Sequence, residues 1–157
     1  MRGCSQITDA AFVHLKGIHT LDISRCDQIT DAAFEHLEGI HTLDISDCPK
    51  IKSKAFVYLR GIHTLTMNRC HQITDAAFVY LKGIHTLNIS MCSRITDAAF
   101  VHLEGIHSLR VFDCYRVTKA GSSHLKGAKI HVEEIKEHEL QDYCYNIFGP
   151  GDYSDEE

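Results

Sequence analysis

Residues 83–105 read GIHTLNISMCSRITDAAFVHLEG, and the same pattern returns along the chain at a constant spacing. Each copy carries one cysteine, and this column comprises Cys4, Cys26, Cys48, Cys70, Cys92 and Cys114. A fixed period between about 20 and 50 residues indicates a stack of like units. Such a stack presents a long regular surface and seldom a catalytic pocket, so the period favours a binding function.

Each unit divides into a strand and a short helix. Apolar and polar residues alternate over 43–46, which predicts a strand with one buried face. Phe56 and Leu59 stand three apart and share one face of a short helix. Either Thr30 or Asp31 lies where a side-chain oxygen can cap such a helix, and Gly61 follows the helical run. One unit cannot bury both elements alone, so stability depends on contacts between stacked copies.

The apolar pattern resembles the leucine-rich repeats, whose signature is LxxLxLxxN/CxL. Five copies match this signature. Each begins at an apolar residue and ends at the apolar residue three positions after the cysteine: 18–29, 40–51, 62–73, 84–95 and 106–117. The resemblance implies an α/β solenoid with a parallel sheet of about six strands on its concave side and short helices on its convex side. It also implies protein recognition, without naming a partner.

Two narrower resemblances concern the cysteine and the strand. Cysteine followed by Ile-Thr-Asp is similar to the cysteine-containing subfamily found in F-box substrate receptors, although the period here is shorter and no F-box is visible. The Gly-Ile-His-Thr-Leu variant resembles repeat proteins of large DNA viruses of the marseillevirus kind. Seven cysteines without a secretory signal fit a reducing compartment, so the protein is expected to be intracellular and cytoplasmic, in the host cytoplasm if it is viral.

The sequence predicts a solenoid over 1–132 and an acidic C-terminal cap and tail over 133–157. Within the solenoid, 1–17 is a partial unit and 18–127 holds the full repeats. The segment 133–157 has nine acidic residues and one lysine, hence a net charge of −8 against −5 for the whole chain, which leaves +3 for 1–132. Its apolar side chains are expected to cover the last repeat, because solenoid ends need a polar-faced cap.

The front of the chain contains a helical run but no strand before Thr20. Either this half-unit shields the first strand, or the edge of that strand is available to another chain. A homodimer formed through this edge is therefore an alternative to binding an outside partner. The chain enters the repeat at Cys4, so no signal peptide is expected, and no apolar run is long enough for a membrane span.

Two columns invite a chemical interpretation. The cysteines are expected to be buried thiols in a reducing compartment, because no local cluster of ligands suggests zinc. A histidine column is expected to stack along the rim, with ring nitrogens bonded to backbone and with lowered pKa values: His19, His41, His63, His85 and His107. No metal or other cofactor is expected, because no carboxylate or cysteine recurs beside these histidines.

The outward face of the strands varies more than the rest of the unit, and it is the candidate partner site. Successive strands carry Asp, Asp, Thr, Asn and Arg at the position of Asp22, so this face is expected to grade from acidic to basic. Its selected residues are Asp22, Arg25, Asp44, Asp47, Arg69, Met91, Arg110 and Phe112. Aromatic, Met and Arg side chains are enriched in interface cores, although a merely solvated polar face explains the pattern about as well. No catalytic motif converges, so the chain is not expected to be an enzyme. A charge of +3 spread over 1–132 makes no basic stripe, so nucleic acid is not expected either.

Overall fold

The computed structural model describes residues 1–123 and 125–133, so the predicted acidic cap and tail lies outside the described residues except for Glu133. The helices are η1 Asp9–Leu15, η2 Asp31–His36, η3 Ser53–Leu59, η4 Asp75–Tyr80, η5 Asp97–His102 and α1 Lys119–Ser122. The strands are β1 Thr20–Asp22, β2 Thr42–Asp44, β3 Thr64–Thr66, β4 Thr86–Asn88, β5 Ser108–Phe112 and β6 Lys129–Glu133.

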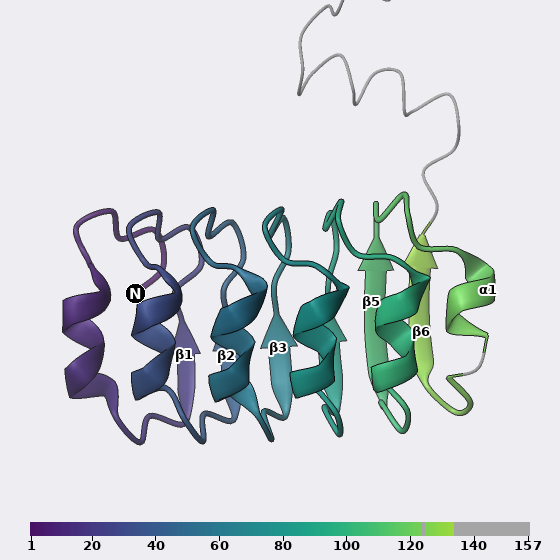
Figure 1. Ribbon diagram of the computed structural model, residues 1–157, viewed down its shortest axis with the longest axis horizontal. Coiled ribbons are helices and arrows are strands. Elements are labelled where there is room, and N and C mark those ends of the chain that lie inside the picture. Colours follow the sequence, from purple (N-terminus) through teal and green to yellow (C-terminus); the bar gives the residue numbers. More distant parts are fainter. Residues whose placement is uncertain (124, 134–157) are drawn as a thin grey trace, which may run out of the picture.

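The strands form one parallel six-stranded sheet in the order β1-β2-β3-β4-β5-β6, and the helices form a second layer over it (Figure 1). This arrangement confirms the predicted α/β solenoid. Each strand of the regular units pairs with its equivalent one full period later, as Leu43 does with Leu65. Between β5 and β6 the paired residues Ser108 and Lys129 are separated by one residue less than a full period, because the sequence before β6 is one residue shorter than in the other units.

The helices η1 to η5 are 3₁₀-helices, a detail that the apolar spacing did not reveal. Each regular unit leaves only six or seven residues for its helix. Over so short a run, hydrogen bonds from residue i+3 to residue i close a turn with fewer residues than an α-helix needs. Leu37 illustrates this, since its N–H donates to the Phe34 carbonyl at 3.0 Å.

The core consists of columns in which one apolar side chain per unit packs on its equivalents. Phe34, Phe56, Phe78 and Phe100 are fully buried, and the leucines on the inner face of β1 to β5 are at most 7% exposed. Burying each such side chain contributes about 1.5–3 kcal/mol before the entropy cost of folding. Ser122 takes the phenylalanine position in the last unit and is also buried, so the column ends there in a small polar side chain.

The cysteine column lies buried between the strands and the helices. Cys48 donates its thiol hydrogen to the Ile23 carbonyl of the preceding unit at 3.1 Å, and Cys92 does the same to Met67 at 3.0 Å. Burial raises the pKa of the Cys48 thiol to about 11 and that of Cys92 to about 12. The prediction that this column consists of inward-pointing thiols that satisfy backbone groups is confirmed for these residues.

A second ladder joins the helix starts of neighbouring units. The Asp75 carboxylate accepts hydrogen bonds from the Thr96 N–H at 2.8 Å and from its hydroxyl at 2.6 Å. Asp97 holds Thr118 in the same way. The sequence offered either the threonine or the aspartate as the cap of each helix. The structure gives that role to the threonine in η2 and η5, where Thr30 and Thr96 accept the N–H of the residue two positions later at 3.3 Å, and it assigns the aspartates to the unit that follows. In the third unit Ser53 replaces the aspartate and bonds Thr74.

The first strand is protected in its side chains but not in its backbone. Leu21 is 7% exposed and Ile23 is fully buried. The Gly3 N–H donates to the Ser24 carbonyl at 2.7 Å, so the first residues cover the end of β1. Beside Thr20–Asp22, however, the part of the chain that the structure describes places no strand on the outer side. The half-unit thus shields the apolar side chains of β1 and leaves its backbone edge unpaired within the described residues.

Candidate functional site

A repeated left-handed turn follows each strand on the concave side. Arg25, Asp47, Arg69, Met91 and Asp113 all have positive φ angles, between 54° and 62°. This conformation costs about 1–3 kcal/mol for a residue other than glycine or asparagine. The sequence placed the first four of these residues on the strands themselves. The structure corrects this placement, because the strands end two to three residues earlier and the chain turns there toward the buried cysteine.

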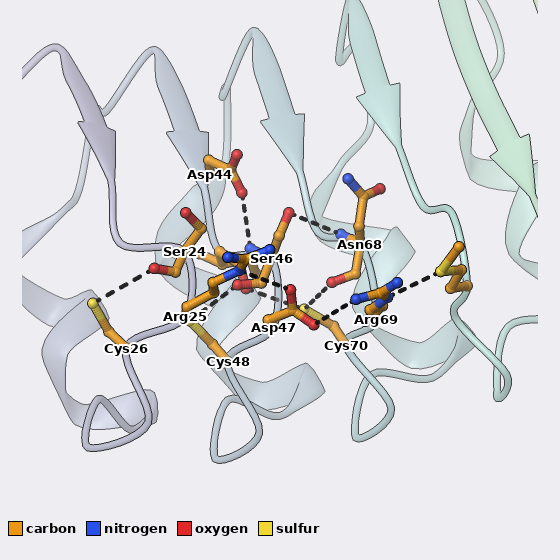
Figure 2. A network of polar contacts seen from close by, with 12 residues as sticks. Ser24, Arg25, Cys26, Asp44, Ser46, Asp47, Cys48, Asn68, Arg69 and Cys70 are labelled. Atoms are coloured by element: carbon orange, nitrogen blue, oxygen red, sulfur yellow. Dashed lines mark hydrogen bonds and ion pairs between the residues drawn. The ribbon is translucent and has the colours of Figure 1, made fainter. Parts of the chain in front are cut away.

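These turns set their side chains in one row along the rim of the sheet, as Figure 2 shows for three of them. The Arg25 guanidinium lies 3.6 Å from the Asp47 carboxylate, and Arg69 lies 3.9 Å from the other oxygen of Asp47. Arg69 Nε donates to the sulfur of Met91 at 3.0 Å. Exposed ion pairs of this kind contribute at most about 1 kcal/mol. The row therefore leaves its charges accessible to a partner.

Asp22 and Asp44 have a structural task that the sequence did not reveal. The Asp22 carboxylate accepts bonds from the Ser24 N–H at 2.9 Å and from its hydroxyl at 2.6 Å. Asp44 accepts the Ser46 N–H at 2.8 Å. Although partial burial opposes it, bonding by Ser24 lowers the pKa of Asp22 below its usual value. Strand alternation predicts outward-facing serines at these positions, but both are buried, because the aspartates fold them onto the strand ends.

A hollow of about 430 Å³ opens on the sheet over the last strands. It is lined by Asn88, Ser90, Arg110, Phe112 and His131. Arg110 and His131 are exposed, and they are directly paired across β5 and β6. Phe112 is half-buried, whereas the sequence suggested a fully exposed ring. The hollow thus combines an apolar ring, a permanent cation, a titratable imidazole and small hydrogen-bonding groups.

One outward column changes its charge from one end of the sheet to the other. Through the paired positions it runs from Asp22 and Asp44 across Thr66 and Asn88 to Arg110, and the pairing with His131 extends it. The predicted grading from acidic to basic is therefore a property of one continuous face. Since exposed charge guides the approach of a partner, an acidic ligand is favoured at the β5–β6 end.

The histidine column stacks along one rim of the sheet. Neighbouring rings lie 4.4–4.5 Å apart and within 12–17° of parallel. Nδ1 of His41, His63 and His85 lies 3.1 Å from the hydroxyl of the following threonine. The expected bond to the backbone is thus replaced by a bond to a side chain. Partial burial lowers the pKa of His41, and the charges of protonated His63 and His19 lower it further.

The described ranges contain no group of three or more His, Cys, Asp or Glu placed to hold a metal ion. Among the same residues, every helix is too short or too polar to cross a bilayer.

Sequence reasoning missed two features of the surface. His131 lines the hollow, but the one-residue deletion before β6 hid which way its strand faces. A row of valines on the helices is exposed by 39–63%, namely Val13, Val57, Val79 and Val101. In the second unit Glu35 takes the position of the valine. The repeated apolar residue at this position of the other units could have predicted the row from the sequence.

Comparison with known proteins agrees with the geometry. The model of the BspA type leucine rich repeat region matches residues 2–107 in six copies. The chain belongs to this leucine-rich-repeat family. No curated protein matches the sequence of this leucine-rich-repeat chain significantly.

Two solved structures share the leucine-rich-repeat fold. The crystal structure of the Rad7 and Elc1 complex in yeast is 19% identical with a TM-score of 0.69, covering 82% of this chain and 38% of that chain. The structure of the TLR13–ssRNA13 complex is 15% identical with a TM-score of 0.53, covering 76% of this chain and 23% of that chain. At this identity the likeness shows the fold alone, and the chain spans well under half of either protein.

Proposed function

We propose that this leucine-rich-repeat chain is a non-enzymatic module that binds a protein through its concave sheet, centred on the hollow over β4 to β6. The observation that carries the proposal is the meeting of Arg110, Phe112 and His131 around one depression. Arginine and aromatic side chains supply most of the binding energy in many interfaces, because they combine a large contact area with hydrogen bonding. The rim row of Arg25, Asp47 and the turns that follow extends this face along the solenoid.

The pattern of variation supports the same face. Residues that bury, cap or bond the next unit repeat almost without change, whereas the column from Asp22 to Arg110 differs in nearly every strand. The side chains of this column vary while the stacking of the units is kept, so they can match a partner, even though Asp22, Asp44 and Asn88 also bond the serine two residues later. Rad7 and TLR13 were both solved as complexes, one with a protein and one with RNA, which fits use of the fold as a binding surface.

The free cysteine thiols favour a reducing compartment. Six cysteines in the part of the chain that the structure describes are free. Free thiols persist in reducing surroundings, and we place the protein in the cytoplasm for that reason.

Affinity capture from the cells that make the protein tests the binding face. The bait is the full chain, beside a concave variant with Arg110→Glu and Phe112→Ser. A second variant, called the convex variant, carries Lys82→Glu after η4 and Val101→Ser on η5. Its change in charge is the same, and its loss of apolar area is smaller and lies away from the strands. A protein retained by the wild type and the convex variant, but lost with the concave variant, supports the proposal. A protein lost equally with both variants, or with neither, contradicts it.

The open edge of β1 favours self-association as a second candidate. Unpaired backbone groups at Thr20–Asp22 can accept a strand of another copy. Light scattering over a range of concentrations measures this directly. A mass that rises with concentration, and is restored to that of the monomer by Thr20→Lys but not by Thr64→Lys inside the sheet, supports pairing through the edge. A constant monomer mass excludes it.

A further inference from the structure

The hollow is the centre of the basic part of the solenoid. Arg110 and His131 face it from neighbouring strands. Lys129 is exposed and stands two residues before His131 on β6, so it shares the same side of the strand. Residues 108–132 carry five basic side chains and one acidic side chain, whereas 1–107 carry a net charge of −1. Positive charge is therefore concentrated at the end where the hollow lies.

The remainder of the same chain has the opposite charge. Residues 134–157 contain eight acidic side chains and one lysine. The final six residues read Asp-Tyr-Ser-Asp-Glu-Glu, so an aromatic ring stands among four carboxylates. A carboxylate matches the guanidinium of Arg110, and an aromatic ring matches the half-buried ring of Phe112. These carboxylates and this ring are therefore chemically complementary to the residues that line the hollow.

The chain also leaves the solenoid beside the hollow. β6 ends at Glu133, which pairs with Phe112 on β5. The segment 134–157 begins next to a lining residue, and each extended residue spans up to about 3.3 Å. Length therefore does not limit its access to the depression. A covalently attached ligand of this kind reaches an effective concentration of the order of millimolar, so even weak contacts are populated.

We propose that the acidic segment 134–157 binds in cis to the hollow over β4 to β6, with its carboxylates against Arg110 and His131. The segment then competes with the outside partner for the same surface, and a partner must displace it. This inference uses the surface of the proposed function, but its test needs no partner. The experiment can therefore show that the segment does not bind the hollow while the proposed partner site still stands, and the reverse.

Paramagnetic relaxation measured by NMR on the full chain tests the contact. A spin label is attached at Ser154→Cys in a chain that also carries Cys4→Ser and Cys144→Ser. The other cysteines of the described residues stay unlabelled, because they are buried and the reagent does not reach their thiols. The expected result is loss of amide signal at Asn88, Arg110 and His131, with signals of Val79 and Val101 on the convex side retained. The loss should persist on dilution and disappear at high salt, since exposed charges are then screened.

Two variants make the result specific. Arg110→Glu should restore the lost signals, whereas Lys82→Glu, with the same change in charge at an exposed site on another face, should leave them lost. Neutralising the four terminal carboxylates (Asp152→Asn, Asp155→Asn, Glu156→Gln and Glu157→Gln) should also restore them without touching the folded repeats. This second variant keeps the test valid if Arg110→Glu disturbs folding.

Other outcomes overturn the inference. Signal loss confined to Leu125 and Ile130 at the end of the stack means that the segment serves only as a cap. Loss that fades on dilution means that a second copy supplies the segment. Equal recovery with Arg110→Glu and Lys82→Glu means that net charge, and not the hollow, attracts it.

Discussion

The buried cysteine column and the outward column from Asp22 to Arg110 belong to the same units, yet they behave in opposite ways. Every cysteine of the first is retained, and all five from Cys26 to Cys114 donate to a carbonyl of the preceding unit. The second changes from acid to base along one sheet. The difference shows that the interior is fixed by contacts between units, whereas the outward column tolerates different side chains, although Asp22, Asp44 and Asn88 each bond the serine two residues later.

A substitution in the core should produce the largest effect. Phe78→Ala removes a fully buried ring that packs between neighbouring units, and we expect the free energy of unfolding to fall by about 3–5 kcal/mol. Val79→Ala, next to it but half exposed, should change stability by no more than about 0.5 kcal/mol. Urea denaturation followed by circular dichroism measures both. Similar losses for the two variants would contradict the assignment of faces.

The ladder between helix starts should give the next largest effect. Asp75→Ala leaves the Thr96 N–H and hydroxyl without their charged acceptor, and we expect a loss of about 1.5–3 kcal/mol. Ser53→Ala removes the weaker neutral contacts with Thr74 and should cost about 0.5–1.5 kcal/mol. Denaturation curves of the two variants test the order. Equal losses would show that the third junction is not the weaker one.

Acid should weaken the stack through the histidines. The pKa of His41 is lowered in the folded protein, so below the unfolded value of about 6.5 the unfolded chain binds more protons. The stabilising contribution is therefore present above that value and is lost as the pH falls below it. The lowered pKa of Asp22 plays no part in this window, because its contribution is lost only near and below about 3.9.

Melting temperatures at pH 7.5 and 5.5 measure this loss. His41→Gln should reduce the drop in melting temperature between the two pH values, because it removes a ring from the middle of the stack. His14→Gln, an exposed histidine outside the stack, should leave the drop unchanged. An unchanged melting temperature of the wild type across this range would refute the expectation.

The concave face should show the smallest effect on stability. Arg110→Glu alters an exposed side chain on the sheet, and we expect unfolding free energy to stay within about 0.5 kcal/mol of the wild type. The same variant is expected to lose the partner. Calorimetry of the purified variant gives the first quantity, and a large destabilisation would mean that Arg110 serves the fold.

The period predicted a stack of strand-and-helix units with buried columns, because each unit repeats the same pattern of apolar residues. The resemblance to the leucine-rich repeats implied the solenoid with its parallel sheet. The period also predicted the grading of charge along the face, since its constant length aligns Asp22 with Asp44 and Arg110. It did not reveal that Arg25, Asp47, Arg69 and Met91 lie in left-handed turns. Side-chain identity gave no sign of this, because none of these positions is glycine.

The sequence by itself thus determined which residues share a column, because a strict repeat converts spacing into neighbours. Only the tertiary structure decided what each column does. Asp75 bonds the unit that follows its own, Ser24 is buried beneath Asp22, and His131 joins Arg110 at the hollow. These roles depend on the direction of each side chain and on the shortened step before β6. The hydrogen bonds that set these directions, within one unit for Ser24 and between neighbouring units for Asp75, form only in the folded geometry and do not follow from the spacing.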